Sequence, residues 1–266
     1  MQEEANTLRA VDVLTPRTLE EALGLKAEVP DAVPIQGGTD LMVELNFDRG
    51  RPAALLNLNE VTELRGWSRD GGHIRLGAGL TYTEAMETPL PALAEAARTV
   101  GGPQIRNRGT IGGNLGTASP AGDALPPLLV CGAEVRVASV RGERTLPLEE
   151  FVTGVKRNAL ADDELILDVS VRADPGRQTF MKVGPRNAMV ISVVSLALRV
   201  DGELTASFGS AGPVPGVVRA PLDGAASFPE QVAAAASPID DVRGTAAYRR
   251  HALRVLTRRA LERCLA

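Results

Sequence analysis

Aromatic residues make up only 3% of the 266 residues of this sequence, so an aromatic-lined substrate pocket would be hard to build from it. Cysteine occurs only at Cys131 and Cys264, which excludes a disulfide framework and any metal cluster held by four cysteines of this chain. Histidine occurs only at His73 and His251, and their separation along the chain argues against a metal site. No Cys/His nucleophile pair and no G-x-S-x-G motif occurs, so we predict no catalytic side chain.

The sequence also lacks strong charge asymmetry and long apolar runs. Its net charge is −4 with acids and bases interspersed, and no basic tract predicts a nucleic-acid partner. The longest apolar runs are too short to cross a membrane. The first ten residues, MQEEANTLRA, are acidic and polar, unlike a secretory signal. We therefore expect a cytoplasmic protein without a membrane span.

The first 60 residues predict a small parallel lobe. Thr18 begins a capping-box pattern that opens a short helix. A buried strand over residues 32–35 leads directly to Gly37-Gly38, and Thr39 is placed to cap the next helix. A second buried strand follows at 54–58, which completes a parallel sheet. The first turn lacks G-x-G-x-x-G, so this is not a Rossmann unit.

The remaining patterns predict an antiparallel α+β lobe and a separate C-terminal domain. The turn Asp174-Pro175-Gly176 gives the boundary, so we expect domains 1–174 (lobes about 1–60 and 61–174) and 175–266. In the C-terminal domain we expect three antiparallel strands, a Gly/Pro linker over 211–221 and a long final helix whose arginines mostly face solvent. The other expected elements are hairpins 67–78 and 134–148, helices 90–100, 124–129 and 229–236, and strands 165–171, 178–183, 190–200 and 203–210.

The stretch from Gly101 to Asp123 organises the chain. It holds seven glycines and two prolines, and only Arg106, Arg108 and Asp123 are charged. Its three large apolar side chains are too few for a helix or strand of its own, so it reads as a loop. Backbone amides in a glycine-rich loop suit phosphate oxygens, and a loop this long is uncommon in a compact domain unless it is functional. An ordinary irregular connection is the alternative.

Two motifs resemble those of a known family. Arg106-Asn107-Arg108-Gly109-Thr110-Ile111-Gly112-Gly113-Asn114, followed by Ala118-Ser119-Pro120-Ala121-Gly122-Asp123, resembles the second FAD motif of the molybdenum hydroxylase flavoproteins. Pro34-Ile35-Gln36-Gly37-Gly38-Thr39-Asp40-Leu41 looks like their first motif. The C-terminal Asp240-Asp241-Val242-Arg243 and Tyr248-Arg249-Arg250-His251 are similar to that family as well, so the resemblance covers nearly the whole chain.

The resemblance implies FAD and a set of contacts, and the absence of His, Cys and Tyr from residues 34–41 and 101–123 predicts that the FAD is bound non-covalently. The first motif would touch the pyrophosphate and adenosine half, the second would cradle the phosphates, and Asp123 would accept hydrogen bonds from the cofactor. Without the resemblance, we would interpret Asp123 as a helix cap and Lys182 as a surface residue. Val100 and Ile166 would be interpreted as core residues. Arg186 would be a flavin neighbour or a partner contact. The expected FAD-binding residues are Pro34, Ile35, Gln36, Gly37, Gly38, Thr39, Asp40, Leu41, Val100, Thr110, Ile111, Gly112, Gly113, Asn114, Thr117, Ser119, Asp123, Ile166 and Lys182.

The function implied by the resemblance is that of the FAD-binding medium subunit, as in carbon monoxide dehydrogenase and bacterial xanthine dehydrogenase. Electrons would arrive from a molybdopterin subunit through an iron–sulfur subunit and leave to NAD, a quinone or another acceptor. The flavin would do the chemistry, and the protein would bind and orient it. Two alternatives remain open at this point: a self-sufficient flavin oxidase or dehydrogenase, and a non-catalytic assembly module.

Overall fold

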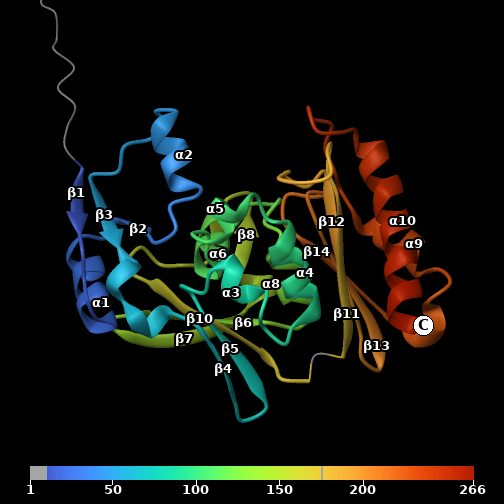
Figure 1. Ribbon diagram of the computed structural model, residues 1–266, viewed down its shortest axis with the longest axis horizontal. Helices are drawn as coiled ribbons and strands as arrows, with labels where there is room; N and C mark the ends of the chain where they lie inside the picture. Colours follow the sequence, from blue (N-terminus) through green and yellow to red (C-terminus); the bar gives the residue numbers. More distant parts are fainter. Residues whose placement is uncertain (1–10, 175) are drawn as a thin grey trace, which may run out of the picture.

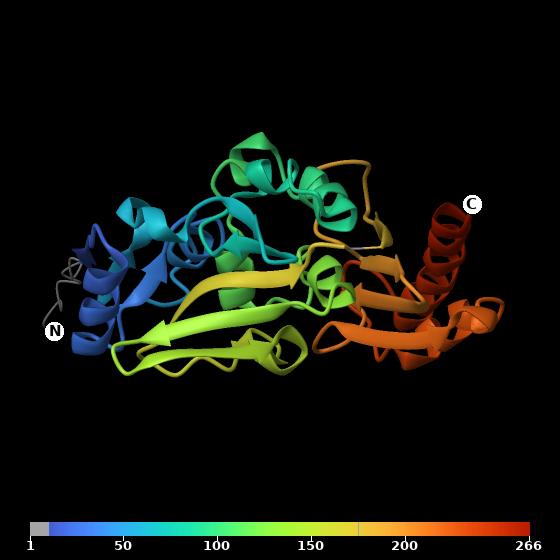
Figure 2. The same cartoon turned by 90° about the horizontal axis from the view of Figure 1, so that it is seen from below.

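The computed structural model describes residues 11–174 and 176–266. Three lobes follow one another in a row, with β1 at one end and α10 at the other (Figure 1, Figure 2). Each lobe has its own cluster of buried apolar side chains. The predicted α+β class is confirmed. The first ten residues, judged unlike a secretory signal, and Pro175 of the expected boundary turn lie outside the described residues.

The N-terminal lobe is the predicted parallel sheet. Its three strands are in the order β1-β3-β2, and both neighbouring pairs run parallel. Thr18 caps the first helix by accepting a hydrogen bond from the Glu21 amide at 3.2 Å. The elements are β1 Asp12–Leu14, α1 Leu19–Glu28, β2 Val33–Ile35, α2 Leu41–Asn46 and β3 Ala54–Asn57, followed by short 3-10 turns at Leu58–Glu60 and Thr62–Leu64.

The middle lobe is built on a five-stranded antiparallel sheet, in the order β4-β5-β10-β6-β7. Both predicted hairpins are present, and strand β10 lies between them. The strands are β4 Trp67–Asp70, β5 His73–Gly77, β6 Glu134–Ser139, β7 Gly142–Pro147 and β10 Leu165–Arg172, with a small ribbon of β8 Val152–Gly154 and β9 Arg157–Asn158. The helices are α3 Tyr82–Ala85, α4 Pro91–Thr99, α5 Pro103–Arg106, α6 Ile111–Thr117, α7 Leu125–Val130 and α8 Leu148–Phe151.

The expectation that Gly101–Asp123 forms no helix of its own was wrong. Two short helices, α5 and α6, lie within it. Ile111 and Leu115, one helical turn apart, are both fully buried in the core of the middle lobe. Few apolar residues suffice here because the lobe around them supplies the rest of the contact surface.

The C-terminal lobe has four antiparallel strands, in the order β11-β12-β13-β14. Three were expected, because residues 211–221 read as a linker. Their last part is β14, where Gly216 lies against the Phe208 ring and leaves no room for a side chain. The elements are β11 Arg177–Val183, β12 Val194–Val200, β13 Glu203–Gly209, β14 Gly216–Pro221, a 3-10 turn Leu222–Gly224, α9 Phe228–Ala235 and α10 Ala246–Leu265.

Helices cover both faces of this last sheet. Helices α9 and α10 pack on the outer face, while α4 and α7 of the middle lobe pack on the inner face (Figure 1). The expectation that the arginines of α10 mostly face solvent fails at Arg249, which is 3% exposed and donates to the Ser210 carbonyl and the Asp241 carboxylate. None of the described helices is long and apolar enough to cross a bilayer.

Candidate functional site

The turn between β2 and α2 carries the first motif. Gly38 has φ +70°, a left-handed conformation that glycine adopts without strain. The carbonyls of Gly38 and Asp40 accept the first hydrogen bonds of α2. Within the described part of the chain, the five amides of residues 37–41 donate no hydrogen bond. Free consecutive amides of this kind suit the oxygens of a phosphate group.

Thr39 does not cap α2, contrary to the sequence prediction. The capping position falls on Asp40, and its side chain makes no capping hydrogen bond. Its carboxylate instead accepts a hydrogen bond from Thr117 Oγ1 at 3.3 Å. Asp40 thus links the first motif to the second one, 77 residues further along the chain.

The second motif is anchored by its own lobe. Thr110 caps α6 and accepts from the Gly113 amide at 3.0 Å. The Ile111 amide donates to Leu80 and the Gly112 amide to Ala78, at 2.9 and 2.7 Å. These amides already have hydrogen-bond partners within the lobe. The second motif therefore offers a ligand its exposed surface and side chains rather than free backbone donors.

The two motifs meet between the lobes. Arg108 Nη2 donates to the Gln36 carbonyl at 2.9 Å and to Asn59 Oδ1 at 3.3 Å. A Cβ on Gly37 would overlap the Arg108 carbonyl, so the two main chains touch. An ion pair between Lys156 and Glu44 of α2, with 2.5 Å between Nζ and Oε1, spans the same gap. Segments that the sequence separates therefore lie side by side at the junction of the two lobes, which is called the cleft below.

The glycines of α6 differ in what surrounds them. Gly112 has no room for a side chain, because a Cβ there would lie 2.7 Å from both Cβ and O of Ala78. Gly113 and Gly116, one helical turn apart, are both exposed. A Cβ on Gly116 would approach only Ile166 Cδ1, at 3.9 Å, and one on Gly113 only Thr110 Oγ1, at 3.0 Å. This face of α6 is bare main chain, open to close approach by another molecule.

An unpaired polar atom accompanies this open face. Asn114 Oδ1 is buried and has no hydrogen-bond partner among the described residues. Buried polar atoms are rarely left unsatisfied. The free amides, the bare helix face and the orphaned amide oxygen together fit an extended ligand that carries phosphate groups.

Comparison with known proteins agrees with this arrangement. Residues 9–172 match the family described as the FAD binding domain in molybdopterin dehydrogenase. This chain belongs to that family. FAD is therefore its cofactor, and the chain is part of an oxidoreductase.

Named relatives span most of the chain. It is 38% identical over 208 residues to the nicotinate dehydrogenase FAD-subunit of Eubacterium barkeri, covering 73% of this chain and 70% of that protein. It is 30% identical over 274 residues to the putative xanthine dehydrogenase FAD-binding subunit of Escherichia coli K12, covering 94% of each. The fold matches a chain of carbon monoxide dehydrogenase from Hydrogenophaga pseudoflava with a TM-score of 0.88 at 23% identity, covering 96% of this chain and 97% of that one.

Asp123 and Lys182 form a buried pair between the middle and C-terminal lobes. Lys182 Nζ donates to Asp123 Oδ2 at 2.7 Å, to the Thr99 carbonyl at 2.8 Å and to the Val190 carbonyl at 3.2 Å. Ser192 Oγ donates to Asp123 Oδ1 at 2.6 Å. Burial raises the pKa of Asp123, and the neighbouring ammonium opposes that shift. All three Lys182 donors thus have protein partners.

This pair corrects two interpretations that the sequence left open. Lys182 is not a surface residue, because its side chain is only 9% exposed. Asp123 is not a helix cap, because α7 begins at Leu125 with Ala124 in the capping position. Both carboxylate oxygens instead hold side chains of the C-terminal lobe. A direct contact of either residue with FAD stays a prediction.

The other predicted site residues have partners of their own in the structure. Ile166 is 8% exposed in β10 and borders the open face at Gly116. Val100 follows α4, and its carbonyl accepts from Arg106 at 3.2 Å. Ser119 Oγ accepts from the Ala121 amide at 3.3 Å. Arg186 donates to the Ala188 and Met189 carbonyls within its own loop. Gly116 was missed, although its spacing from Gly112 and Gly113 is visible in the sequence.

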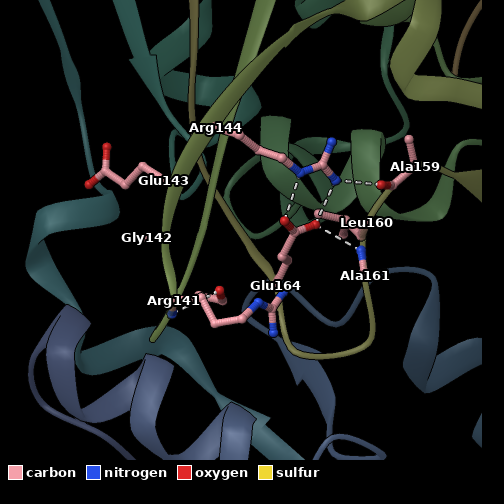
Figure 3. Close-up of a pocket in the computed structure, with 9 residues that line it drawn as sticks. Arg141, Gly142, Glu143, Arg144, Ala159, Leu160, Ala161 and Glu164 are labelled. Carbon is pink, nitrogen blue, oxygen red and sulfur yellow. Dashed lines mark hydrogen bonds and ion pairs between the residues drawn. The ribbon is translucent and has the colours of Figure 1, made fainter.

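A surface hollow elsewhere in the middle lobe has a structural explanation. It lies where the β6–β7 hairpin meets the segment before β10, and it contains none of the predicted site residues. Figure 3 shows Arg144 and Glu164 pointing toward one another there. Arg144 Nε and Nη2 each donate to the Glu164 carboxylate at 2.7 Å, and these bonds lower the pKa of Glu164. The polar groups satisfy one another, so we assign no ligand to this hollow.

Two buried titratable groups of the middle lobe are not poised for acid–base work. Burial raises the pKa of Tyr82 far above its usual value, so its phenol stays protonated. Burial also raises the pKa of Cys131 to about 11, and its Sγ accepts from Gln178 Nε2 at 3.1 Å. Cys131 is therefore part of the core of the middle lobe. Across the described residues, no group of three or more His, Cys, Asp or Glu side chains is arranged to hold a metal ion.

Proposed function

We propose that this chain is the flavin link of an electron relay in a molybdenum hydroxylase complex. The single observation that carries the proposal is the junction of the two motifs, where the turn with the free amides of residues 37–41 is joined through Asp40 and Thr117 to α6, which exposes Gly113 and Gly116. This arrangement would bind and orient a cofactor, and its charged side chains Asp40, Glu44 and Lys156 are engaged in contacts between the lobes. Bound FAD would supply the redox centre, receiving electrons from a companion chain and releasing them to an acceptor such as NAD or a quinone.

The chain's own residues divide this task. The amides of the first motif would hold the phosphates, while the open face of α6 would let the cofactor lie close to the main chain. A hollow beside the first motif, lined by Val33, Leu41, Leu45 and Pro52 among others, would offer apolar contacts to a ring of the cofactor. The Asp123–Lys182 pair would fix the C-terminal lobe against this cleft.

The remaining redox groups belong on other chains in this proposal. Each [2Fe–2S] cluster needs four thiolates, and the two cysteines here are buried and widely separated. We therefore propose an iron–sulfur subunit and a molybdopterin-binding subunit as partners. The names of the relatives, as FAD subunits of nicotinate and xanthine dehydrogenases, support this assignment.

The test compares the isolated chain with the assembled complex. Alone, the chain should show FAD absorbance and no hydroxylation of purines, aldehydes or carbon monoxide. Purified with its companions from the native host, it should contain iron and molybdenum, and the substrate of the complex should reduce its flavin. Full activity of the isolated chain on an organic substrate would favour a self-sufficient flavin oxidase, and a folded chain that binds no flavin would favour an assembly module.

A further inference from the structure

The segment that follows α6 is tied to the C-terminal lobe at two points. It comprises residues 119–123, the last part of the second motif, and is called the motif tail. At its far end Asp123 pairs with Lys182, as described above. At its near end the Pro120 carbonyl accepts a hydrogen bond from the Ser210 amide at 2.7 Å. The orientation of the motif tail therefore depends on where the C-terminal lobe holds Ser210.

Ser210 directly follows β13 and has a strained main chain. Its φ is +59°, in the left-handed region that residues other than glycine rarely adopt. Its buried hydroxyl oxygen has no hydrogen-bond partner among the described residues, so the side chain does not account for this conformation. The preceding Gly209 has no room for a side chain, because a Cβ there would lie 2.7 Å from Ser195 Oγ and 3.2 Å from the Pro120 carbonyl oxygen. The main chain of this turn is thus what meets the motif tail.

Arg249 of α10 fixes the Ser210 carbonyl from the other side. Its Nη1 donates to that carbonyl at 2.5 Å, and its Nη2 donates to Asp241 Oδ1, also at 2.5 Å. A planar guanidinium that reaches two acceptors holds them at a fixed separation. Arg249 is only 3% exposed, so the contact is shielded from water. Helix α10 and the turn before it therefore determine where Ser210 lies.

Packing alone does not call for an arginine at this position. Burying a charge is costly, and apolar residues of similar volume often replace buried ion pairs with little loss of stability. Arg249 carries a further cost, because its buried Nε has no partner among the described residues. With an apolar residue in its place, Asp241 would keep the Arg243 and Gly244 amides as donors. What such a residue cannot supply is the bond that orients the main chain of Ser210.

We propose that Arg249 is a positioning residue for FAD. Through the main chain of Ser210 it sets the position of the Pro120 carbonyl, and so presents the motif tail to the cofactor without touching the cofactor itself. This inference rests on the proposed function, in which the second motif borders the cofactor cleft. Because coupling between two sites is reciprocal, bound FAD should in turn hold the Ser210–Pro120 contact closed.

The experiment compares variants of α10 by fluorescence titration of the FAD-free chain and by thermal unfolding. Arg249→Met removes the bond to Ser210, and FAD affinity should fall about tenfold, within the range usual for coupled sites. Leu253→Ala is the matched control, because Leu253 lies one helical turn further along and is fully buried in the core of the C-terminal lobe. It should lower the unfolding temperature through the cavity it creates and leave FAD affinity unchanged.

A second control tests the loss of an arginine from the same helix. Arg254 Nε donates to Glu230 of α9 at 2.6 Å, within the C-terminal lobe. Arg254→Met should therefore bind FAD as the wild type does. Wild-type affinity in Arg249→Met, or equal losses in Arg249→Met and Leu253→Ala, would overturn the inference, since the second result would show a general weakening of the lobe.

Amide hydrogen exchange of the wild type gives a readout that needs no variant to fold. FAD should slow exchange of the Ser210 amide more than exchange of the amides of α9, which lie in the same lobe and make no contact with the motif tail among the printed hydrogen bonds of the fold. Equal slowing at both places would overturn the inference and leave the electron-relay proposal intact. A folded wild-type chain that binds no FAD would instead overturn the proposed function.

Discussion

Replacing Gly116 by leucine separates cofactor binding from folding more cleanly than other changes in the cleft. A Cβ at this position would meet only Ile166 Cδ1, at 3.9 Å, and the glycine is exposed in helix α6. The protein therefore has room for the new side chain. If the cofactor lies against this face, the four carbons of leucine occupy the place where it must pass.

Gly116→Leu should affect folding stability and FAD affinity in different directions. Glycine in a helix interior is less favourable than alanine or leucine by about 0.5–1 kcal/mol. Gly116→Leu should thus leave the free energy of unfolding of the FAD-free chain unchanged or slightly raised. FAD affinity should fall at least 100-fold, which corresponds to about 2.7 kcal/mol. Gly116→Ala should give a smaller loss, because it adds a single carbon.

The assay is a titration of the FAD-free chain with FAD, followed by flavin fluorescence, alongside thermal unfolding of each variant. Gly24→Leu is the matched control. Gly24 also lies inside a helix, α1, where a Cβ would have no neighbouring atom within 4 Å, and its replacement should leave FAD affinity unchanged. Wild-type affinity in Gly116→Leu would show that the cofactor does not use this face, and the reasoning about the open helix surface would be refuted.

Three further predictions follow from other contacts. FAD should be bound non-covalently, because no His, Cys or Tyr lies in residues 34–41 or 101–123; acid precipitation should leave a colourless pellet, and a yellow pellet would contradict this. Gly37→Ala should lower FAD content and thermal stability together, because its Cβ would overlap the Arg108 carbonyl; a stable variant with normal flavin would show that the lobes tolerate separation. Glu164→Gln should destabilise the chain by about 1–3 kcal/mol at neutral pH, through loss of the charge-assisted bonds from Arg144. Because the folded-state pKa of Glu164 is lowered, the stability difference between wild type and variant should shrink as the pH falls below about 4.3, the ordinary pKa of a glutamate. Denaturant unfolding across a pH series measures this difference, and a difference that does not change with pH would contradict the prediction.

The sequence predicted those parts of the fold that local patterns determine. The hairpin across Asp70-Gly71-Gly72, the cap at Thr18 and the strand that leads into Gly37-Gly38 all depend on neighbours within a few residues. The number of strands in the C-terminal lobe did not follow, because β14 is defined by its pairing with β13 and not by its own composition.

The same distinction between local patterns and distant contacts applies to the candidate site. The positions of the two motifs were visible, but the reasons for individual glycines were not. Gly112 is required by Ala78, and Gly37 by Arg108, both distant in sequence. Gly116 is open because nothing packs on it, a property of the folded surface alone. Lys182 read as a surface residue since its partners Thr99 and Asp123 lie 59 or more residues away.

The direct contact of main chain with main chain at Gly37 and Arg108 has a consequence for variation among relatives of this chain. The distance between the N-terminal and middle lobes is set there by atoms that every amino acid shares, apart from the single requirement for glycine. Apart from Arg108, Lys156 and Glu44, which also join the lobes, side chains along the cleft can change without moving the two halves apart. Sequence divergence can thus alter how tightly a cofactor is held, or its redox potential, while the width of the opening stays constant.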